Sequence, residues 1–268
     1  AASPCPRRIV CLTEETTETL YRLGLQDRIV GVSGFTVRPP EARKKPRVSS
    51  FLDADYEKIL ELQPDLVLGF SDLQAELGGE LVKRGVPVHL FNQRSLVEVL
   101  QAVRVIGALV GAAKEAEALA DELRANVEQL ARENASLPFR PRVFFEEWHE
   151  PLISGIRWVS ELIEVLGGDD VCAESRVHQG AKGRIYEPSE VARRDPQLVI
   201  ASWCGRHAKK DKIVSRDGWA DVDAVKNDQL YEVKSAFILQ PGPALFTDGA
   251  AQVARIIRAA AMGERLPP

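Results

Sequence analysis

The sequence lacks the features that define several large classes of protein. No apolar run reaches the ~18 residues that a membrane-spanning helix needs. The formal net charge is −4, which argues against a nucleic-acid partner, because nucleic-acid-binding domains usually carry a basic face. No G-x-S-x-G motif, phosphate loop or dinucleotide fingerprint occurs. With no motif for turnover, we expect a binding protein rather than an enzyme.

Histidine and cysteine are scarce and scattered. No two of the four histidines stand four residues apart. The sequence therefore lacks the pair of histidines on one helix face that binds zinc in metalloproteases. The four cysteines are spaced too widely for a zinc site built from cysteine pairs. We therefore expect neither a metal ion nor a resident cofactor. The residues concerned are His89, His149, His178, His207, Cys5, Cys11, Cys172 and Cys204.

The sequence is compatible with more than one cellular location of the protein. No signal peptide is visible before the first strand-like run, so a signal was either removed before residue 1 or never present. A disulfide involving Cys172 or Cys204 would require an extracytoplasmic setting. We expect a periplasmic or other extracytoplasmic protein and keep a cytoplasmic one as the alternative.

What the chain does contain is an ordinary globular composition arranged as alternating strands and helices. Its 268 residues are 45% hydrophobic, enough for a core in each of two small domains. Strand-like and helix-like runs alternate through the first half, which predicts an α/β protein with parallel sheets. The predicted strands are 8–12, 29–32, 66–69 and 88–91, and the predicted helices are 16–23, 56–62 and 74–84.

An internal repeat indicates two similar halves. The segment from Arg8 to Glu15 resembles the segment from Arg140 to Glu147, and Glu14 and Glu146 lie 132 residues apart (146 − 14). Pro64 and Pro196 stand at the same offset in a second matching pair of segments. A third pair, 86–91 and 229–234, matches loosely. The second half should therefore repeat the strand and helix plan of the first.

A long helix should separate the halves. Residues 112–135 contain no proline or glycine, and an apolar stripe recurs at three- and four-residue spacing. Such a helix would be ~36 Å long and would hold two lobes at a nearly fixed angle. We predict an N-terminal lobe over 1–110, a connecting helix over 111–137 and a C-terminal lobe over 138–268. The alternative is an ordinary helix within one domain.

The ligand should lie beyond the carboxyl ends of the strands, in a cleft between the lobes. Aromatic side chains gather at these ends although only 6% of the chain is aromatic, which favours a wide ligand with a planar face. Two glutamate pairs stand there as well and should oppose each other, unless some of them cap helices. The candidate ligand-binding residues are Glu14, Glu15, Phe35, Phe70, Phe91, Glu146, Glu147, Trp148, Trp203 and Phe237.

The order of these segments resembles the cobalamin-binding substrate-binding proteins of ABC importers, within the class that also binds siderophores and haem. The resemblance spans about residues 8–257 and includes Arg38-Pro39-Pro40, the run 163–168 and Gly218-Trp219. It implies two Rossmann-like lobes on a rigid helix, a corrinoid ligand, and docking on an ABC permease through acidic residues. It also implies a monomer with no catalytic residues.

The charged residues are compatible with more than one class of ligand. Family members usually have neutral side chains where the two glutamate pairs stand, so these pairs suggest an amide-rich or cationic ligand. Arginines that could meet an anionic siderophore or haem compete with them: Arg38, Arg94, Arg157 and Arg206. An intracellular carrier or an enzyme that reuses the fold is the remaining alternative.

Overall fold

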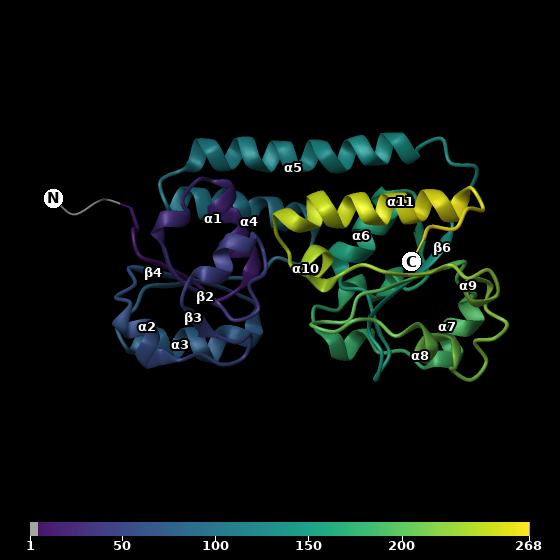
Figure 1. Ribbon diagram of the computed structural model, residues 1–268, viewed down its shortest axis with the longest axis horizontal. Coiled ribbons are helices and arrows are strands. Elements are labelled where there is room, and N and C mark those ends of the chain that lie inside the picture. Colours follow the sequence, from purple (N-terminus) through teal and green to yellow (C-terminus); the bar gives the residue numbers. More distant parts are fainter. Residues whose placement is uncertain (1–4, 268) are drawn as a thin grey trace. The chain divides into compact units, whose positions relative to one another are not determined.

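The computed structural model describes residues 5–267 and divides them into two compact units. Each unit is an α/β sandwich with helices on both faces of a mainly parallel sheet, as the sequence predicts (Figure 1). None of the helices in residues 5–267 is both long and apolar enough to cross a bilayer. Unit 1 contains the chain up to Gln93, Val97–Leu123 and Pro241–Pro243, and unit 2 contains Arg94–Leu96, Arg124–Gln240 and the chain from Ala244 onward.

The sheet of unit 1 is entirely parallel, with the strand order β3-β2-β1-β4-β5. The sequence predicts four of these strands closely but not β3, which is only three residues long and has an exposed first residue. The strands are β1 Ile9–Cys11, β2 Ile29–Ser33, β3 Arg47–Ser49, β4 Leu66–Phe70 and β5 Val88–Phe91.

Four helices cover this sheet. Val10 and Leu12 point to the same face, because strand side chains alternate, and they pack there against residues of α2 and α3. Figure 1 shows α2 and α3 on this side and α1 and α4 on the other. The helices are α1 Glu14–Arg22, α2 Tyr56–Glu61, α3 Ala75–Lys83 and α4 Leu96–Leu109.

The sheet of unit 2 has the order β10-β9-β6-β7, with β8 also pairing with β6. Its strands β6, β8, β9 and β10 are parallel, whereas β7 folds back against β6 as a hairpin. The strands are β6 Arg142–Trp148, β7 Ile153–Ser154, β8 Asp169–Asp170, β9 Leu198–Ala201 and β10 Leu230–Glu232.

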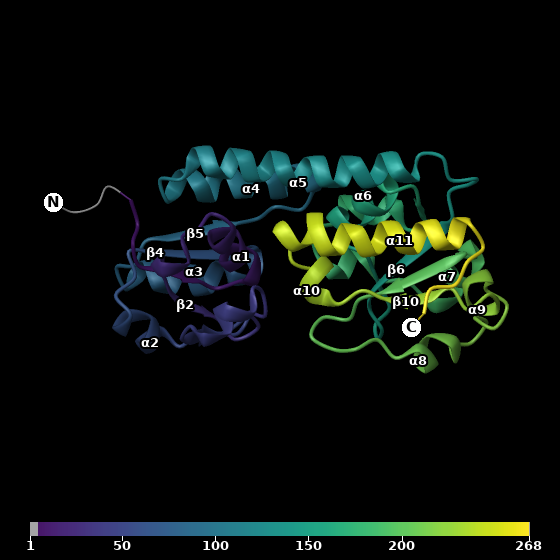
Figure 2. The ribbon, with the colours of Figure 1, turned by 45° about the horizontal axis from the view of Figure 1, so that its top comes forward.

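Helices also cover both faces of the second sheet. Phe144 and Val199 pack against residues of α7, α8 and α9. Figures 1 and 2 show α6 and α11 together on one side of the strands and α8 on the opposite side. The helices are α6 Arg157–Val165, α7 Pro188–Arg194, α8 Lys210–Val214, α9 Asp223–Lys226, α10 Ser235–Ile238 and α11 Ala250–Ala261, which follows a π-helical turn at Leu245–Gly249.

The long helix predicted over 112–135 is α5, Ala113–Asn134. Leu119, Leu123 and Val127 form its buried stripe. Residues of α5 up to Leu123 belong to unit 1, and those from Arg124 onward belong to unit 2. The lobe boundaries at 110 and 137, and the rigidity of this helix, stay predictions.

The repeat is real but its register in the first strand differs from the prediction. Ile9 pairs with Leu66 in unit 1, and Val143 pairs with Leu198 in unit 2. Because Leu66 and Leu198 are counterparts at the predicted offset of 132, Val143 is the counterpart of Ile9, at an offset of 134 (143 − 9). In this register Glu146 corresponds to Leu12, so the predicted equivalence of Glu14 and Glu146 is wrong.

Candidate ligand-binding edges

The carboxyl edge of the unit 1 sheet presents large apolar side chains to solvent. Phe35 follows β2, Leu52 follows β3 and Leu73 follows β4. Their relative exposures are 53%, 66% and 61%. Exposed apolar groups gathered at one edge are typical of ligand-binding surfaces, whereas isolated ones are common anywhere.

Hydrogen bonds tie these loops to one another. The side chain of Gln74 is fully buried and donates through Nε2 to the carbonyl of Phe51 at 2.9 Å, which joins the loops after β3 and β4. Its Oε1 accepts the backbone N–H of Phe70 at 2.9 Å. The N–H of Gly34 donates to the carbonyl of Ser49 at 2.7 Å and joins the loop after β2 to the last residue of β3. The apolar side chains therefore stand on a connected platform of loops.

The turn after β4 is strained. Ser71 has φ = +78°, a conformation that side-chain-bearing residues rarely adopt. Its backbone N–H donates to the carbonyl of Phe91 at 2.6 Å, and its Oγ accepts the N–H of Leu73 at 3.0 Å. These bonds hold the turn that carries Leu73 to the surface.

Among the aromatic residues predicted for unit 1, only Phe35 is exposed. Phe70 and Phe91 are buried, with exposures of 6% and 7%, because the last residues of β4 and β5 point into the unit. Sequence reasoning missed Leu52 and Leu73, since it searched for aromatic rings at the strand ends. Their position directly after a strand was the available signal.

Glu14 and Glu15 begin helix α1, but they differ in burial. Glu14 is half-buried, whereas Glu15 is buried and packs against Gly242, where an added Cβ would lie 2.5 Å from Cβ of Glu15. The hydroxyl of Thr13 donates to Oε1 of Glu15 at 2.5 Å, while its Oε2 has no hydrogen-bond partner among the described residues. Burial raises the pKa of Glu15 to about 8 and also raises that of Glu14.

Glu146 is fully buried inside unit 2 and does not present a free carboxylate. Nη1 and Nη2 of Arg216 donate to its two oxygens, each at 2.7 Å. The indole Nε1 of Trp203 donates to Oε1 at 3.0 Å. Trp203 is itself buried in the core, so its predicted place at a ligand-exposed position is not what the structure shows.

Glu147 is neutralised by a different arginine. Nη1 of Arg184 lies 2.6 Å from Oε2 and Nη2 lies 3.0 Å from Oε1, and the guanidinium is almost completely buried. The N–H of Ile156 also donates to Oε2, at 3.0 Å. The structure thus gives both carboxylates of the second pair a structural partner within unit 2. Whether the two glutamate pairs oppose each other stays a prediction.

Trp148 and His149 stand at the carboxyl end of β6. The ring of Trp148 is half-buried, its Nε1 donates to the carbonyl of Glu150 at 2.9 Å, and the guanidinium of exposed Arg206 lies 5.7 Å from its centroid. His149 stacks on Trp203 with centroids 4.9 Å apart. Burial, and then the neighbouring cations of Arg216 and Lys212, lower the pKa of His149. Trp148 and Arg206 are therefore among the accessible groups at this edge, together with the exposed Cys204 after β9.

The other candidate arginines differ in availability. Arg38 pairs with Glu18 at 3.1 Å, and Arg157 pairs with Glu161 at 2.7 Å. Arg94 is buried. The structure therefore favours Arg206 over these three for direct contact with a ligand.

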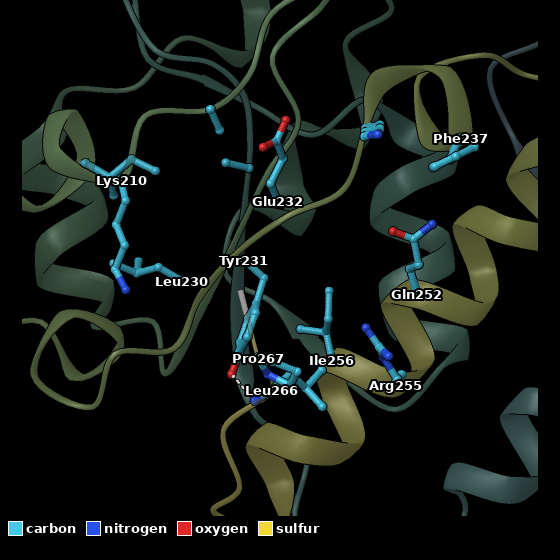
Figure 3. Close-up of a pocket in the computed structure, with 14 residues that line it drawn as sticks. Lys210, Leu230, Tyr231, Glu232, Phe237, Gln252, Arg255, Ile256, Leu266 and Pro267 are labelled. Carbon is cyan, nitrogen blue, oxygen red and sulfur yellow. Dashed lines mark hydrogen bonds between the residues drawn. The ribbon is translucent and has the colours of Figure 1, made fainter. Parts of the chain in front are cut away.

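Phe237 belongs to a different place from Trp148. It lines a pocket of about 520 Å³ within unit 2, which lies along strand β10 between α8 and α11 (Figure 3).

Among residues 5–267, no group of three or more His, Cys, Asp or Glu side chains could hold a metal ion. No disulfide joins the cysteines; Cys11 and Cys172 are buried, which raises the pKa of each to about 12, and Cys204 is exposed.

Related proteins match most of the chain. One is an uncharacterized ABC transporter substrate-binding lipoprotein of Bacillus subtilis, 26% identical over 262 residues, which are 94% of this chain and 80% of that protein. Another is the vitamin B12-binding protein of Vibrio cholerae, 27% identical over 248 residues, which are 90% of this chain and 86% of that protein.

Solved structures show the same fold. The periplasmic vitamin B12-binding protein of Vibrio cholerae superimposes with a TM-score of 0.75 at 25% identity, over 95% of this chain and 98% of that one. A periplasmic heme-binding protein from Roseiflexus gives a TM-score of 0.83 at 21% identity, over 95% and 99% of the two chains, and shows the fold alone.

A model of a whole protein family also matches most of the chain. The family model described as periplasmic binding protein covers residues 9–237. Members bind and carry solutes rather than catalyse reactions, and those of ABC importers deliver small-molecule ligands to a permease. This chain belongs to the periplasmic binding protein family, as a substrate-binding protein of the ABC-importer type.

Proposed function

We propose that this protein captures a corrinoid of the cobalamin type and delivers it to an ABC permease from an extracytoplasmic compartment. The ligand would contact the carboxyl edges of both units, and the protein would act as a monomer. The observation that carries the proposal is the apolar platform of Phe35, Leu52 and Leu73, in a chain whose relatives include vitamin B12-binding proteins.

The platform suits a large, nearly planar ligand. Its side chains are exposed, so a ligand would remove them from water and gain ~25 cal/mol for each Å² of apolar surface covered. The loops are cross-linked by Gln74 and Gly34, which reduces the ordering that binding must impose. On the other unit, Trp148 adds a half-buried indole with Arg206 over it.

Charge also supports a neutral, amide-bearing ligand. Four ionised carboxylates facing one ligand would favour a cation, because a neutral ligand would have to supply a donor to each carboxylate to offset its desolvation. Arg216 and Arg184 neutralise Glu146 and Glu147, and the raised pKa of Glu15 keeps it protonated at neutral pH. Glu14 then remains as the half-buried carboxyl that could accept a hydrogen bond from a ligand amide.

Titration of the purified protein with cyanocobalamin and, separately, with hemin tests this proposal. We expect saturable binding of one cyanocobalamin and a weaker response to hemin, by calorimetry or by the change in ligand absorbance. Tighter binding of hemin, or no binding of cyanocobalamin, would overturn the corrinoid proposal.

Substitutions at the platform locate the site. Leu73→Ser or Phe35→Ser should weaken cyanocobalamin binding by about tenfold each, since burial of such a side chain is worth ~1.5 kcal/mol or more. Phe139→Ser is the matched control, because Phe139 is 44% exposed but precedes β6, at the opposite end of the strand. Equal losses in all three variants would show that the platform is not the site.

A further inference from the structure

The pocket beside β10 is lined by neither Trp148 nor Arg206, two accessible groups described above for unit 2. It has a volume of about 520 Å³, within the range of small-molecule sites, and all of its lining residues belong to unit 2. Strand β10 forms its floor and pairs only with β9 among the described strands. Figure 3 shows Lys210 on one side of β10 and Gln252 with Arg255 on the other, so the pocket opens onto the free edge of the sheet.

The backbone at this edge offers donors and acceptors. The carbonyl of Gln229 accepts from Val199, and the N–H of Val233 donates to Ala201, so alternate residues of β10 bond to β9. The intervening residues, Leu230 and Glu232, therefore turn their N–H and carbonyl groups away from β9. Leu230 and Glu232 also help to line the pocket at this free edge of the sheet.

The charged side chains of the pocket do not balance. Lys210 pairs with Asp228, and Oε1 of Glu232 lies 3.1 Å from Nδ1 of His207, so Glu232 is the one carboxylate among the lining residues. Lys234 and Arg255 form no ion pair with any residue of the described chain. The pocket thus carries unmatched positive charge, and on α11 Arg255 lies one turn beyond Gln252 on the same helix face.

The rest of the lining is largely apolar. Ile213 of α8, Leu230 of β10 and Ile256 of α11 contribute branched side chains, and Leu266 closes one end. The backbone N–H of Leu266 donates to the hydroxyl of Tyr231 at 3.2 Å, so this end of the pocket is held in place.

We propose that this pocket is a second ligand site, which binds a small organic anion with a short aliphatic body. Arg255 and Lys234 would meet the anionic group, assisted by the amide of Gln252, and the branched side chains would cover the aliphatic part. The site is distinct from the proposed corrinoid contacts, because neither Trp148 nor Arg206 lines it and all of its lining residues belong to unit 2.

Octanoate tests the site, with octanamide as its uncharged counterpart. We expect octanoate to shift the backbone amide resonances of Leu230 and Glu232 in a nitrogen-15 NMR titration of the whole chain, and octanamide to bind at least tenfold more weakly. The shifts should persist with saturating cyanocobalamin. Displacement of octanoate by cyanocobalamin would overturn the separate site while leaving the corrinoid proposal intact.

Two variants complete the test. Arg255→Gln should weaken octanoate binding by about tenfold, because it removes the charge-assisted hydrogen bonds. Arg193→Gln is the matched control, an exposed arginine of α7 outside the pocket, and should leave octanoate affinity unchanged. Equal affinity of octanoate and octanamide, no binding of either, or equal losses in both variants would overturn the proposal.

Discussion

At the same position in their sheets, unit 1 has Leu12 and unit 2 has Glu146. Both side chains are completely buried, on the face covered by α2 and α3 in one unit and by α7, α8 and α9 in the other. Leu12 packs against other aliphatic groups, whereas Glu146 accepts hydrogen bonds from Arg216 and Trp203. The repeat therefore preserves the strand and its register but not the chemistry of the core.

The buried carboxyl groups of the two units are also stabilised in different ways. Glu146 lies against a cation, and its geometry is bidentate, which offsets much of the cost of removing two charges from water. The side chain of Glu15 in unit 1 accepts from the hydroxyl of Thr13, a neutral group, and burial raises its pKa. One carboxyl group is stabilised as an ion pair, and the other is stabilised by keeping its proton.

Removing the cation from unit 2 should have the largest effect. We expect Arg216→Met to lower the free energy of unfolding by about 3–5 kcal/mol, because it leaves Glu146 charged and buried without a counter-ion. Urea unfolding followed by tryptophan fluorescence measures this, since all four tryptophans belong to unit 2.

The double variant Glu146→Leu with Arg216→Met makes the comparison direct, since it gives unit 2 the residue type of unit 1. It should recover most of the lost stability, because no charge stays buried. The control Arg206→Met, in the exposed loop after β9, should change stability by less than about 0.5 kcal/mol. A double variant as unstable as Arg216→Met alone would contradict this account.

Trp203→Ala should be the next most damaging change. Its side chain is buried in the core of unit 2 and donates to Glu146, so truncation should cost about 3 kcal/mol of stability. Circular dichroism during urea unfolding would measure the loss. Unchanged stability would mean that Trp203 is not a core residue and could contact the ligand.

Glu15→Gln should stabilise unit 1 in a pH-dependent way. The folded pKa of about 8 lies above the usual 4.5, so the folded state holds a proton that the unfolded state releases between these values. Stability of the natural chain therefore falls as the pH rises from 4.5 to 8, and Gln removes this loss. The gain should be small at pH 5 and should grow steadily as the pH rises to 8, because the unfolded state gives up its proton over this range and the folded state keeps it.

Chemical unfolding followed by far-ultraviolet circular dichroism at both pH values measures this gain. Glu61→Gln, an exposed residue of α2, is the matched control and should show no such pH dependence. An equal gain at pH 5 and pH 8 would mean that Glu15 is ionised in the folded state.

Trp148→Ala should have the smallest effect on folding, while weakening ligand binding. Trp148 is half-buried at the end of β6, so its truncation should cost ~1 kcal/mol of stability. Cyanocobalamin affinity should fall by about tenfold, if the indole covers part of the ligand. Calorimetry of the variant beside Trp203→Ala would separate an accessible tryptophan from a core one.

The sequence predicts the elements well, because their signals are local. The run 88–91 is strand β5, and the helix predicted over 112–135 differs from α5 by one residue at each end. Strand β3 escapes prediction because its three residues carry little periodicity. The break between α4 and α5 falls at Gly111, whose φ of +73° ends the preceding turn.

The candidate site is harder to predict, because partners distant in the sequence decide it. Arg216 stands 70 residues from Glu146, and Arg184 stands 37 residues from Glu147, so no local pattern shows that these carboxylates are neutralised. A shift of two residues in the repeat was enough to align Glu146 with Glu14 instead of Leu12.

The cysteines give the protein a ready position for chemical labelling. The thiolate is the form of cysteine that attacks thiol-reactive dyes, and burial keeps Cys11 and Cys172 protonated and inaccessible. Cys204 is exposed directly after Trp203, at the carboxyl end of β9, while Cys5 is half-buried and could be changed to serine. A maleimide fluorophore would then attach at Cys204 and report optically on events at the edge of unit 2, with its tryptophans untouched.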